Sequence, residues 1–330
     1  MGSIYPESLG GSGGDVFHLI AQTEALMAGG STGVVMGLGS LSIALPPILH
    51  LGNDEQKTRF ITPVLKGEKI AALAVTEPGT GSDVAGIRTT ARRDGDDYVI
   101  NGSKLFITSG ARADFVSVLC RTGEDPHGGL TFLVVERGMP GFSVSKSLKK
   151  MGWRASDTAE LAFDNVRVPV ENRIGPEGSG FLAVMNNFQN ERLSLAVVGH
   201  ATAELALAES ERYVREREAF GRKVIGFQVT RHTLARMSTL VRASKSLNYQ
   251  VADAMRRGQT VVEEVSQAKN FASEVAGQVC DEAVQLHGGM GYMRETVVER
   301  LFRDARLLPI GGGTREIMNE VIARVRGYRA

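Results

Sequence analysis

The stretch "AVTEPGTGSDV", Ala74 to Val84, reveals more about this chain than any other segment of similar length. It follows an apolar run and consists mainly of glycines and small hydroxyl side chains around a Pro78-Gly79 turn. Such a turn exposes backbone N–H groups and hydroxyls, which suits a close approach to the edge of a flat cofactor ring. A plain β-turn would explain the same local chemistry, so the interpretation depends on what accompanies it.

Its companion is "NERLSL", Asn190 to Leu195, which places a carboxylate, Glu191, beside a cation, Arg192, at the start of an alanine-rich helical run. A carboxylate near a flat cofactor is a candidate general base. The alternative interpretation of Glu191 is an acidic residue in the first turn of a helix, which the helix dipole favours. Together the two stretches predict an enzyme with a flavin-like cofactor and Glu191 as its base.

The composition excludes several classes of protein. Among 330 residues, 38 Lys and Arg nearly cancel 37 Asp and Glu, so no broad basic surface for nucleic acid or acidic lipid is expected. The two cysteines argue against a disulfide framework, and six scattered histidines without a paired spacing argue against a metal site. No apolar run is long enough for a membrane span, and no signal peptide is apparent. We therefore expect a cytoplasmic protein.

The chain divides into three zones, with expected domains at 1–69, 70–168 and 169–330. The first zone has a helical pattern, in which "LGGSGGD" (9–15) and "GLGS" (37–40) are interpreted as turns because they match no phosphate-binding spacing. The last zone is helical again, with apolar stripes and with Gly258 and Gly288 as expected helix ends. Long helices joined by short loops predict a bundle.

Short runs rich in β-branched residues fill the middle zone. They are "AALAVT", "GIRTTARR", "DYVINGSKLFIT", "FVSVLCR", "LTFLVVE", "FSVSKSL" and "TAELAF". Turn residues separate the runs, and Asn101-Gly102 inside the third run is interpreted as one of these turns. Short strands at this spacing predict a small β-barrel or sandwich rather than a βαβ sheet.

Six motifs in one order identify a family: "AVTEPGTGSDVAGI", "YVINGSKLFITSGARADF", "ERLSLAVV", "REREAFGRKVIGFQ", "QLHGGMGYMRE" and "GGGTREI". The chain resembles the acyl-CoA dehydrogenases, from about Tyr5 to Arg324. The resemblance implies an α+β fold with a helical N-terminal domain, a middle β-barrel domain and a C-terminal four-helix bundle, assembled as a homotetramer or homodimer. It also implies FAD as cofactor, an acyl-CoA substrate, electron-transfer flavoprotein as acceptor, and a place in fatty acid β-oxidation.

The resemblance also implies functional residues by position. The flavin ring would be held from the β-domain side by Leu73, Val75, Thr76, Gly81, Ser82, Phe106, Ile107 and Thr108. Contacts to the FAD of a neighbouring subunit are implied for Arg217, Phe220 and Gln228, and contacts to the pyrophosphate and adenosine for Gln285, Leu286, Gly288, Gly289, Thr314 and Glu316. The substrate would contact Ser82, Gln189, Asn190, Arg192, Gly312 and Gly313. The alternatives are a solvated helix face for Arg217 and a helix C-cap for residues 285–289.

The position of the base departs from many relatives. In those, the catalytic glutamate stands just before the Gly-Thr of the last motif, where this chain has Gly312. Members similar to the isovaleryl and long-chain branches instead place a glutamate on a bundle helix immediately before an arginine, and Glu191-Arg192 matches that pattern. The resemblance therefore implies that Glu191 is the base. It also implies that the Gly312 N–H and a ribityl hydroxyl of the flavin donate to the thioester carbonyl.

Substrate and activity stay partly open. The segment "GGTREIM" is similar to the long-chain branch, whereas "GMPGFSVSKSLKKMGWRASDT" is more similar to the isovaleryl branch. Family members usually carry further helices before the segment that matches "YPESLGG", so we expect a truncated N-terminal domain. Two alternatives to a dehydrogenase follow: a flavoprotein-like scaffold without turnover, and an acyl-CoA oxidase that passes electrons to oxygen.

Overall fold

The structure, a computed structural model, describes residues 2–328, without the side chains of Ser40 and Leu41. Its contacts divide the chain into two compact units. The first comprises the residues up to Gly14, Met36–Lys150 and Arg154–Phe188. The second comprises Asp15–Val35, Met151–Trp153 and the residues from Gln189 onward.

Short helices form the N-terminal part of the first unit. They are η1 (Glu7–Leu9), α3 (Ser40–Ala44), α4 (Pro46–Leu51), α5 (Asp54–Gln56), the π-helical turn η2 (Lys57–Ile61) and α6 (Thr62–Leu65), while α2 (Thr32–Leu38) has residues in both units. α4 begins with Pro46, whose fixed φ suits the first helical position. Asn53 and Gln56 form a capping box at α5, in which each side chain accepts a hydrogen bond from the other residue's backbone N–H.

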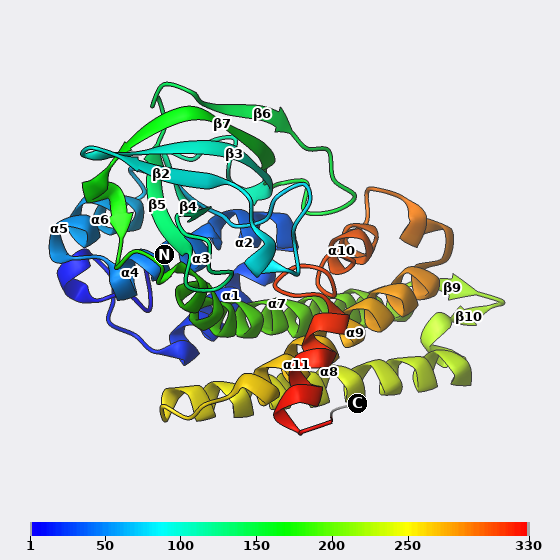
Figure 1. The fold of residues 1–330 in the computed structure, drawn as a ribbon. Helices are drawn as coiled ribbons and strands as arrows, with labels where there is room; N and C mark the ends of the chain where they lie inside the picture. Colours follow the sequence, from blue (N-terminus) through cyan, green and yellow to red (C-terminus); the bar gives the residue numbers. More distant parts are fainter. Residues whose placement is uncertain (1, 329–330) are drawn as a thin grey trace. The chain divides into compact units, whose positions relative to one another are not determined.

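The first unit contains one eight-stranded sheet (Figure 1), with the order β6-β7-β3-β2-β4-β5-β8 and with β1 paired to β4. The strands are β1 (Ala71–Ala74), β2 (Thr90–Asp94), β3 (Asp97–Thr108), β4 (Phe115–Arg121), β5 (Leu130–Glu136), β6 (Phe142–Ser147), β7 (Thr158–Pro169) and β8 (Arg173–Ile174), with the 3₁₀ turns η3 (Val84–Gly86) and η4 (Val170–Asn172). The predicted runs at 97–108, 115–121 and 130–136 are confirmed as strands over the same residues.

The prediction that Asn101-Gly102 forms a turn is wrong. Strand β3 continues through the pair, with a register shift against β7 between Ile100 and Gly102. A Cβ at Gly102 would lie 2.6 Å from Thr89 Oγ1, so a close approach between chain segments explains this glycine. The chain reverses instead at Gly95, which has a φ of +62° and lies between the paired strands β2 and β3.

The sheet curls around one apolar core. Six strands (β1, β2, β3, β4, β5 and β7) contribute buried side chains to it, among them Ala74, Ala91, Tyr98, Val118, Leu133 and Leu161. A flat sheet could not bring side chains from so many strands into a single cluster. The middle of the chain is therefore a barrel-like β-domain.

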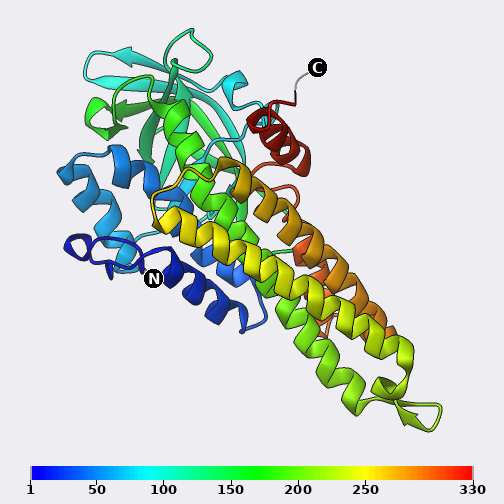
Figure 2. The ribbon, with the colours of Figure 1, turned by 90° about the horizontal axis from the view of Figure 1, so that it is seen from below.

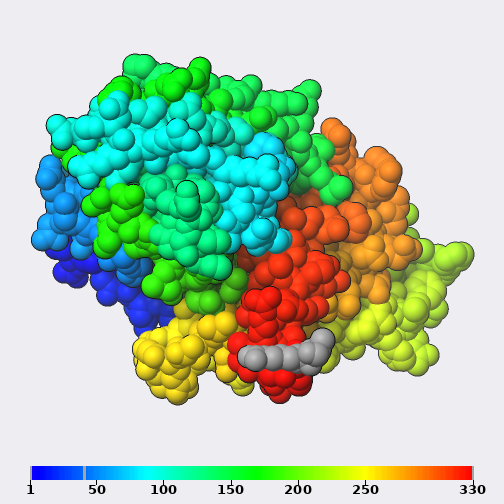
Figure 3. All heavy atoms as spheres, in the orientation of Figure 1, coloured from blue at the N-terminus to red at the C-terminus, as the bar shows by residue number. Residues whose placement is uncertain are grey.

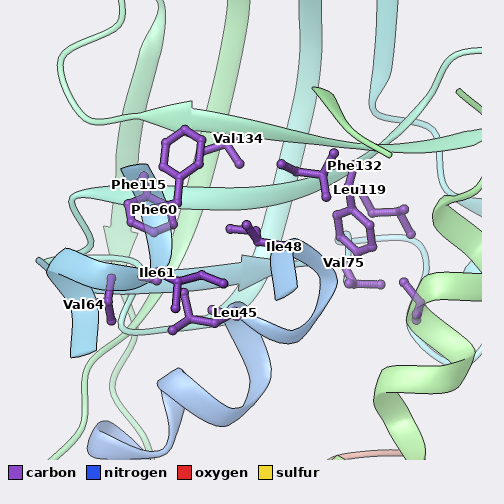
Figure 4. Close-up of a cluster of buried hydrophobic side chains, with 14 of the residues drawn as sticks. Leu45, Ile48, Phe60, Ile61, Val64, Val75, Phe115, Leu119, Phe132 and Val134 are labelled. Atoms are coloured by element: carbon purple, nitrogen blue, oxygen red, sulfur yellow. The ribbon is translucent and has the colours of Figure 1, made fainter. Parts of the chain in front are cut away.

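The N-terminal helices pack on a second group of side chains from the same sheet. Leu45, Ile48 and Phe60 lie against sheet residues that include Phe115 (Figure 4). The rings of Phe60 and Phe115 are tilted at 52° with their centroids 5.1 Å apart, a favourable aromatic geometry. Val75 belongs to the same cluster. The packing of the helices therefore also anchors the start of the loop that follows β1.

Long helices form the second unit. The three longest, α7 (Gly180–Glu216), α8 (Gln228–Arg256) and α9 (Val262–His287), are drawn in green, yellow and orange in Figure 2; residues 180–188 of α7 belong to the first unit. α1 (Val16–Met27), η6 (Gly288–Tyr292), α10 (Val297–Ala305) and α11 (Arg315–Val325) complete it. A hairpin of β9 (Glu218–Ala219) and β10 (Arg222–Lys223), followed by η5 (Val224–Gly226), links α7 to α8 and projects at the surface in Figure 3.

Small residues let the bundle helices approach closely. A Cβ at Gly199 on α7 would lie 3.0 Å from the carbonyl oxygen of Ala272 on α9. On α8, Asn248 donates from Nδ2 to the Ala196 carbonyl oxygen at 2.9 Å, which joins α8 to α7. Ile20 of α1 is buried in one hydrophobic cluster with Ala196 and Ala272. The first helix therefore packs with the bundle, unlike the short helices that follow it.

The predicted fold class is confirmed: a mixed α and β chain with a helical C-terminal region. Gly258 and Gly288 follow α8 and α9 as predicted, with φ of +72° and +57°. Since the compact units do not follow chain order, the domain limits at 69 and 168 stay a prediction. Within residues 2–328, every helix is too short or too polar to cross a lipid bilayer.

Candidate active site

Glu191 lies about three turns inside α7, which begins at Gly180. The structure therefore corrects the expectation that Glu191 stands at the start of a helix. The effect of the helix dipole is confined to the first turn. It does not explain a carboxylate at this depth in the helix.

Two cations lie near Glu191. Arg192, the next residue, is 6% exposed, and Lys269 on α9 is 0% exposed. Burial raises the pKa of Glu191 to about 7, although the charges of Arg192 and Lys269 pull this pKa downward. No described residue hydrogen-bonds to the carboxylate. Its lone pairs are therefore free to accept a proton from a ligand.

Gly312 lies beside the same carboxylate. A Cβ at Gly312 would be 3.6 Å from Glu191 Oε1 and 2.3 Å from Leu195 Cδ1. Gly312 and Gly313 have φ of +64° and +99°, which only glycine adopts without strain. Among the described residues, neither glycine donates its N–H to a backbone acceptor. Two positions far apart in the sequence thus meet at one place, with two N–H groups available there.

The loop that carries Gly312 is anchored by its neighbours. Lys269 donates from Nζ to the carbonyl oxygen of Gly313 at 2.5 Å. Thr314 then caps α11, and its hydroxyl accepts a hydrogen bond from the backbone of the first turn. Of the other predicted substrate residues in this unit, Gln189 is half-buried and Asn190 is exposed.

In the first unit, two hydrogen bonds tie the loop after β1 to β3. The Leu105 N–H donates to the Thr76 carbonyl oxygen at 2.8 Å, and Lys104 Nζ donates to the Val75 carbonyl oxygen at 2.9 Å. These bonds bring the two predicted flavin segments, 73–82 and 106–108, next to each other.

The surface of these segments fits a flat ring. A Cβ at Gly79 or Gly81 would meet nothing within 4 Å, so the loop is open there. Phe106 is a large apolar side chain, yet it is 64% exposed, with a φ of +61°. Val75 (8% exposed) and Ile107 (2%) lie in the core, so only their backbone atoms can meet a cofactor. Leu73, Thr76 and Thr108 are half-buried and Ser82 is exposed, which leaves them accessible to a ring.

A third set of predicted FAD residues lies at the far end of α7 and α9. Tyr213 stacks on His287 there, with ring centroids 4.3 Å apart. The set is exposed apart from the half-buried Leu286, and its other members are Arg217, Phe220, Gln228, Gln285, Gly288 and Gly289. An α-helix rises about 1.5 Å per residue, so Arg217 lies about 39 Å along α7 from Glu191. The same rise separates Gln285 from Lys269, and hence from Thr314 and Glu316, by about 24 Å.

Sequence reasoning missed three charged residues. Lys104 on β3 is 0% exposed, and its Nζ lies 2.9 Å from Glu77 Oε1. Glu77 also accepts hydrogen bonds from the backbone N–H groups of Arg88 and Thr89, at 2.8 and 2.9 Å. The third missed residue is Lys269, which contacts the loop beside Glu191.

A signal for both lysines was present in the periodicity. Lys104 occupies an inward position of β3, in the alternation that buries Tyr98 and Ile100. Lys269 stands four residues after Val265, within the buried stripe of α9. A lysine in an apolar stripe indicates a buried partner, and this signal would have pointed to both contacts.

The cluster in the second unit has the features of an acid–base site. Glu191 has a pKa near neutrality, accepts no hydrogen bond from the described residues and faces a glycine with an available N–H. A carboxylate in this arrangement is suited to accept a proton, beside a position that can bind a developing oxyanion. These features are typical of enzymes that move a proton with a shielded carboxylate.

Comparison with known proteins shows the family. Models of the N-terminal, middle and C-terminal domains of acyl-CoA dehydrogenases match residues 1–68, 72–166 and 178–326. A solved structure from Mycobacterium abscessus, described as a probable acyl-CoA dehydrogenase, is 52% identical, with a TM-score of 0.98 over 99% of this chain and 87% of that one. The chain belongs to the acyl-CoA dehydrogenase family, and the prediction of an oxidoreductase of this kind is confirmed.

Two further relatives differ in their named substrates. The long-chain specific mitochondrial acyl-CoA dehydrogenase of Rattus norvegicus is 39% identical over 98% of this chain and 76% of its own length. The short-chain specific acyl-CoA dehydrogenase of Clostridium acetobutylicum is 38% identical over 98% of this chain and 86% of its own length. Since the two identities are nearly equal, overall similarity does not decide the acyl length.

Proposed function

We propose that this protein catalyses the FAD-dependent α,β-dehydrogenation of an acyl-CoA to the trans-2-enoyl-CoA, with Glu191 as the base. The proposal is carried by one observation: within this fold, the Glu191 carboxylate lies 3.6 Å from the place where a side chain at Gly312 would begin. The two positions at which the family places its catalytic glutamate therefore share one space, and only Glu191 supplies a carboxylate to it.

Glu191 removes the α-proton in this mechanism. An α-proton beside a thioester is weakly acidic, so the base needs a pKa near the working pH and protection from water. Burial raises the pKa of Glu191 to about 7, and no residue between 2 and 328 donates a competing hydrogen bond to the ionised carboxylate. When the C–H electron pair moves toward the thioester, negative charge develops on the carbonyl oxygen. The Gly312 N–H donates to that oxygen and stabilises the charge.

FAD is the proposed cofactor. In the first unit, the backbone of 73–82 and the exposed Phe106 would hold the flavin ring. When bound, the flavin supplies the acceptor for the hydride that leaves the β-carbon, so that the C–C bond becomes a double bond. The chain's own residues orient the substrate and exclude water around Glu191.

The distance along α7 favours a site shared between copies of the chain. Arg217, just past the end of α7, lies about 39 Å along the helix axis from Glu191, and Phe220 and Gln228 follow it across the hairpin. If they bind the FAD, they bind the molecule that belongs to another copy. We therefore propose a homodimer or homotetramer, with electron-transfer flavoprotein as the acceptor and β-oxidation as the setting.

The decisive test is Glu191→Gln, with Glu211→Gln on the same helix as the matched control. The rate of flavin bleaching by acyl-CoA without oxygen should fall at least about 10²-fold in Glu191→Gln and stay unchanged in the control. Both variants should bind FAD as the wild type does. Retained bleaching in Glu191→Gln would refute the assignment of the base.

The same assay separates the other readings. A screen across straight and branched acyl-CoA esters of increasing length defines the substrate. A purified protein that is colourless and takes up no added FAD would favour the scaffold. Hydrogen peroxide formed in proportion to product would favour an oxidase.

A further inference from the structure

We propose that Lys269 is a positioning residue for this reaction: its ammonium group fixes the glycine loop through the Gly313 carbonyl and places a positive charge beside Glu191. The inference rests on the proposed function, because it concerns the same site. It adds a residue from α9 to a site otherwise built from α7 and the loop before α11.

The burial of Lys269 calls for an explanation. Its side chain is 0% exposed, and burying an ammonium group is costly unless the group is paired. Lys269 lies in a stripe of small and apolar residues, where a leucine or methionine would fill the space without this cost. Among the described residues, its Nζ donates one hydrogen bond, to the Gly313 carbonyl oxygen at 2.5 Å. The buried ammonium group therefore has its hydrogen-bond partner in the glycine loop.

The loop needs such a restraint. Gly312 and Gly313 both have positive φ, a conformation that glycine can adopt but also leave easily. On one side of them the Gly311 N–H donates to the Leu307 carbonyl oxygen at 2.9 Å. On the other side Lys269 holds the Gly313 carbonyl. The Gly312 N–H lies between these two anchors, so its direction depends on both.

The charge of Lys269 acts on Glu191 without a direct hydrogen bond. The charged groups that act on Lys269 are Glu191 and Arg192 on α7 and Arg315 and Glu316 on α11. Burial and Arg192 lower the pKa of Lys269 to about 8, so the group is still mainly protonated at pH 7. A nearby cation favours the ionised form of Glu191 and leaves its oxygens free for the substrate proton.

Two substitutions separate the bond from the charge. Lys269→Met removes both, whereas Lys269→Gln keeps an N–H donor for the Gly313 carbonyl and removes the charge. Ser273→Ala is the matched control, because Ser273 is buried one turn further along α9 and its hydroxyl donates to the Lys269 carbonyl oxygen.

We expect Lys269→Met to slow flavin bleaching about 10²-fold with little change in KM, because a displaced donor affects the reacting geometry more than binding. Lys269→Gln should recover most of the lost rate. In both variants the acidic limb of the pH–rate profile should move to higher pH by about one unit, since a neighbouring positive charge is gone. Ser273→Ala should change neither quantity.

A second measurement does not depend on turnover. Infrared difference spectra of the Glu191 carboxyl, assigned with Glu191→Gln, give its titration directly. The carboxyl should titrate at higher pH in both Lys269 variants. If none of the acyl-CoA esters bleaches the flavin of the wild type, the proposed function fails. The titration of the carboxyl still decides whether Lys269 affects Glu191.

The inference would be overturned if Lys269→Met had the same bleaching rate, the same pH–rate profile and the same carboxyl titration as the wild type. Should Lys269→Met fail to fold, the same three results in Lys269→Gln would overturn it. A wild-type carboxyl titration together with a slow bleaching rate would overturn the proposed effect of the charge on Glu191. It would support the hydrogen bond to the Gly313 carbonyl as the role of Lys269.

Discussion

The two units each bury a lysine next to a glutamate, and the two pairs behave in opposite ways. In the first unit, Lys104 bonds directly to Glu77, which also accepts two backbone hydrogen bonds. In the second unit, Lys269 bonds to a backbone carbonyl, and Glu191 has no hydrogen-bond partner among the described residues. We call the Lys104–Glu77 pair saturated, because the glutamate accepts hydrogen bonds from several donors. We call the site of Lys269 and Glu191 open, because the carboxylate of Glu191 accepts none from the described residues.

This difference reverses the pKa shifts. Burial by itself raises the pKa of Glu77, but Lys104 and the hydrogen bonds from Thr89 and Arg88 outweigh it and leave the pKa below its usual value. For Glu191 burial prevails over two nearby cations, and the pKa rises to about 7. Hydrogen bonding to the ionised form therefore accounts for the opposite directions in which the pKa values of the two glutamates shift.

The largest expected effect is on the saturated pair. Lys104→Met leaves Glu77 as a buried anion without its counter-ion, and we expect the free energy of unfolding of the first unit to fall by about 3–5 kcal/mol. Trp153, the only tryptophan, belongs to the second unit. Urea unfolding followed by circular dichroism should therefore shift more than unfolding followed by tryptophan fluorescence.

The controls for this change are a surface lysine and the double variant. Lys66→Met, at an exposed position, should alter stability by less than about 0.5 kcal/mol. Lys104→Met combined with Glu77→Gln should recover part of the loss, because no buried charge is left unpaired. A Lys104→Met variant as stable as the wild type would show that the pair does not anchor the loop.

Much of the fold could be predicted because it depends on local patterns. Short runs rich in β-branched residues located three strands to the residue, and glycines with positive φ follow α8 and α9 as predicted. Asn101-Gly102 misled because its glycine reflects contact with Thr89, which is distant in the sequence. Likewise, α1 packs with the bundle through Ile20, and local pattern cannot show this.

The site was predicted less completely, for the same reason. Glu191 and Gly312 were identified by motif, and their convergence is a property of the folded second unit. The motif did not indicate Lys269 or Lys104, since their roles depend on carbonyl oxygens of loops elsewhere in the chain. The functional assignment of all these residues stays a prediction until it is tested.

The next largest effect concerns the stability cost of Glu191. Its raised pKa means that the folded state binds more protons than the unfolded state between about pH 4.5 and 7, so the free energy of unfolding falls as pH rises through this window. Glu191→Gln removes this dependence. Its stability relative to the wild type should increase by about 2 kcal/mol between pH 5.5 and pH 8.

Tryptophan fluorescence is the appropriate probe, since Glu191 and Trp153 share the second unit. Glu77→Gln, followed by circular dichroism because Glu77 lies in the first unit, should show no such gain at pH 8, since the lowered pKa of Glu77 contributes stability above the usual glutamate pKa. An equal stability difference at both pH values would contradict a raised pKa at Glu191.

A smaller effect is expected in the pH dependence of the reaction. Well below pH 7 the fraction of ionised Glu191 decreases about tenfold per pH unit, and the rate of flavin bleaching should follow it. Above pH 7 this limb should level off. Stopped-flow measurements with a saturating acyl-CoA test the prediction, and a rate independent of pH from 5.5 to 8 would exclude Glu191 as the titrating base.

The smallest effect, and the sharpest test of the open site, is to move the base. Glu191→Ala combined with Gly312→Glu should bleach only a few-fold faster than Glu191→Ala alone. A side chain at Gly312 must accept a φ of +64°, which costs about 1–3 kcal/mol, and its Cβ would lie 2.3 Å from Leu195 Cδ1.

Adding Leu195→Val to this double variant removes the obstructing atom. The bleaching rate should then increase to about tenfold over that of Glu191→Ala with Leu195→Val alone. Equal rates with and without the glutamate at 312 would mean that the carboxylate must come from α7. Recovery would show that the space beside the glycine loop defines the catalytic position, and that either chain segment can supply the base to it.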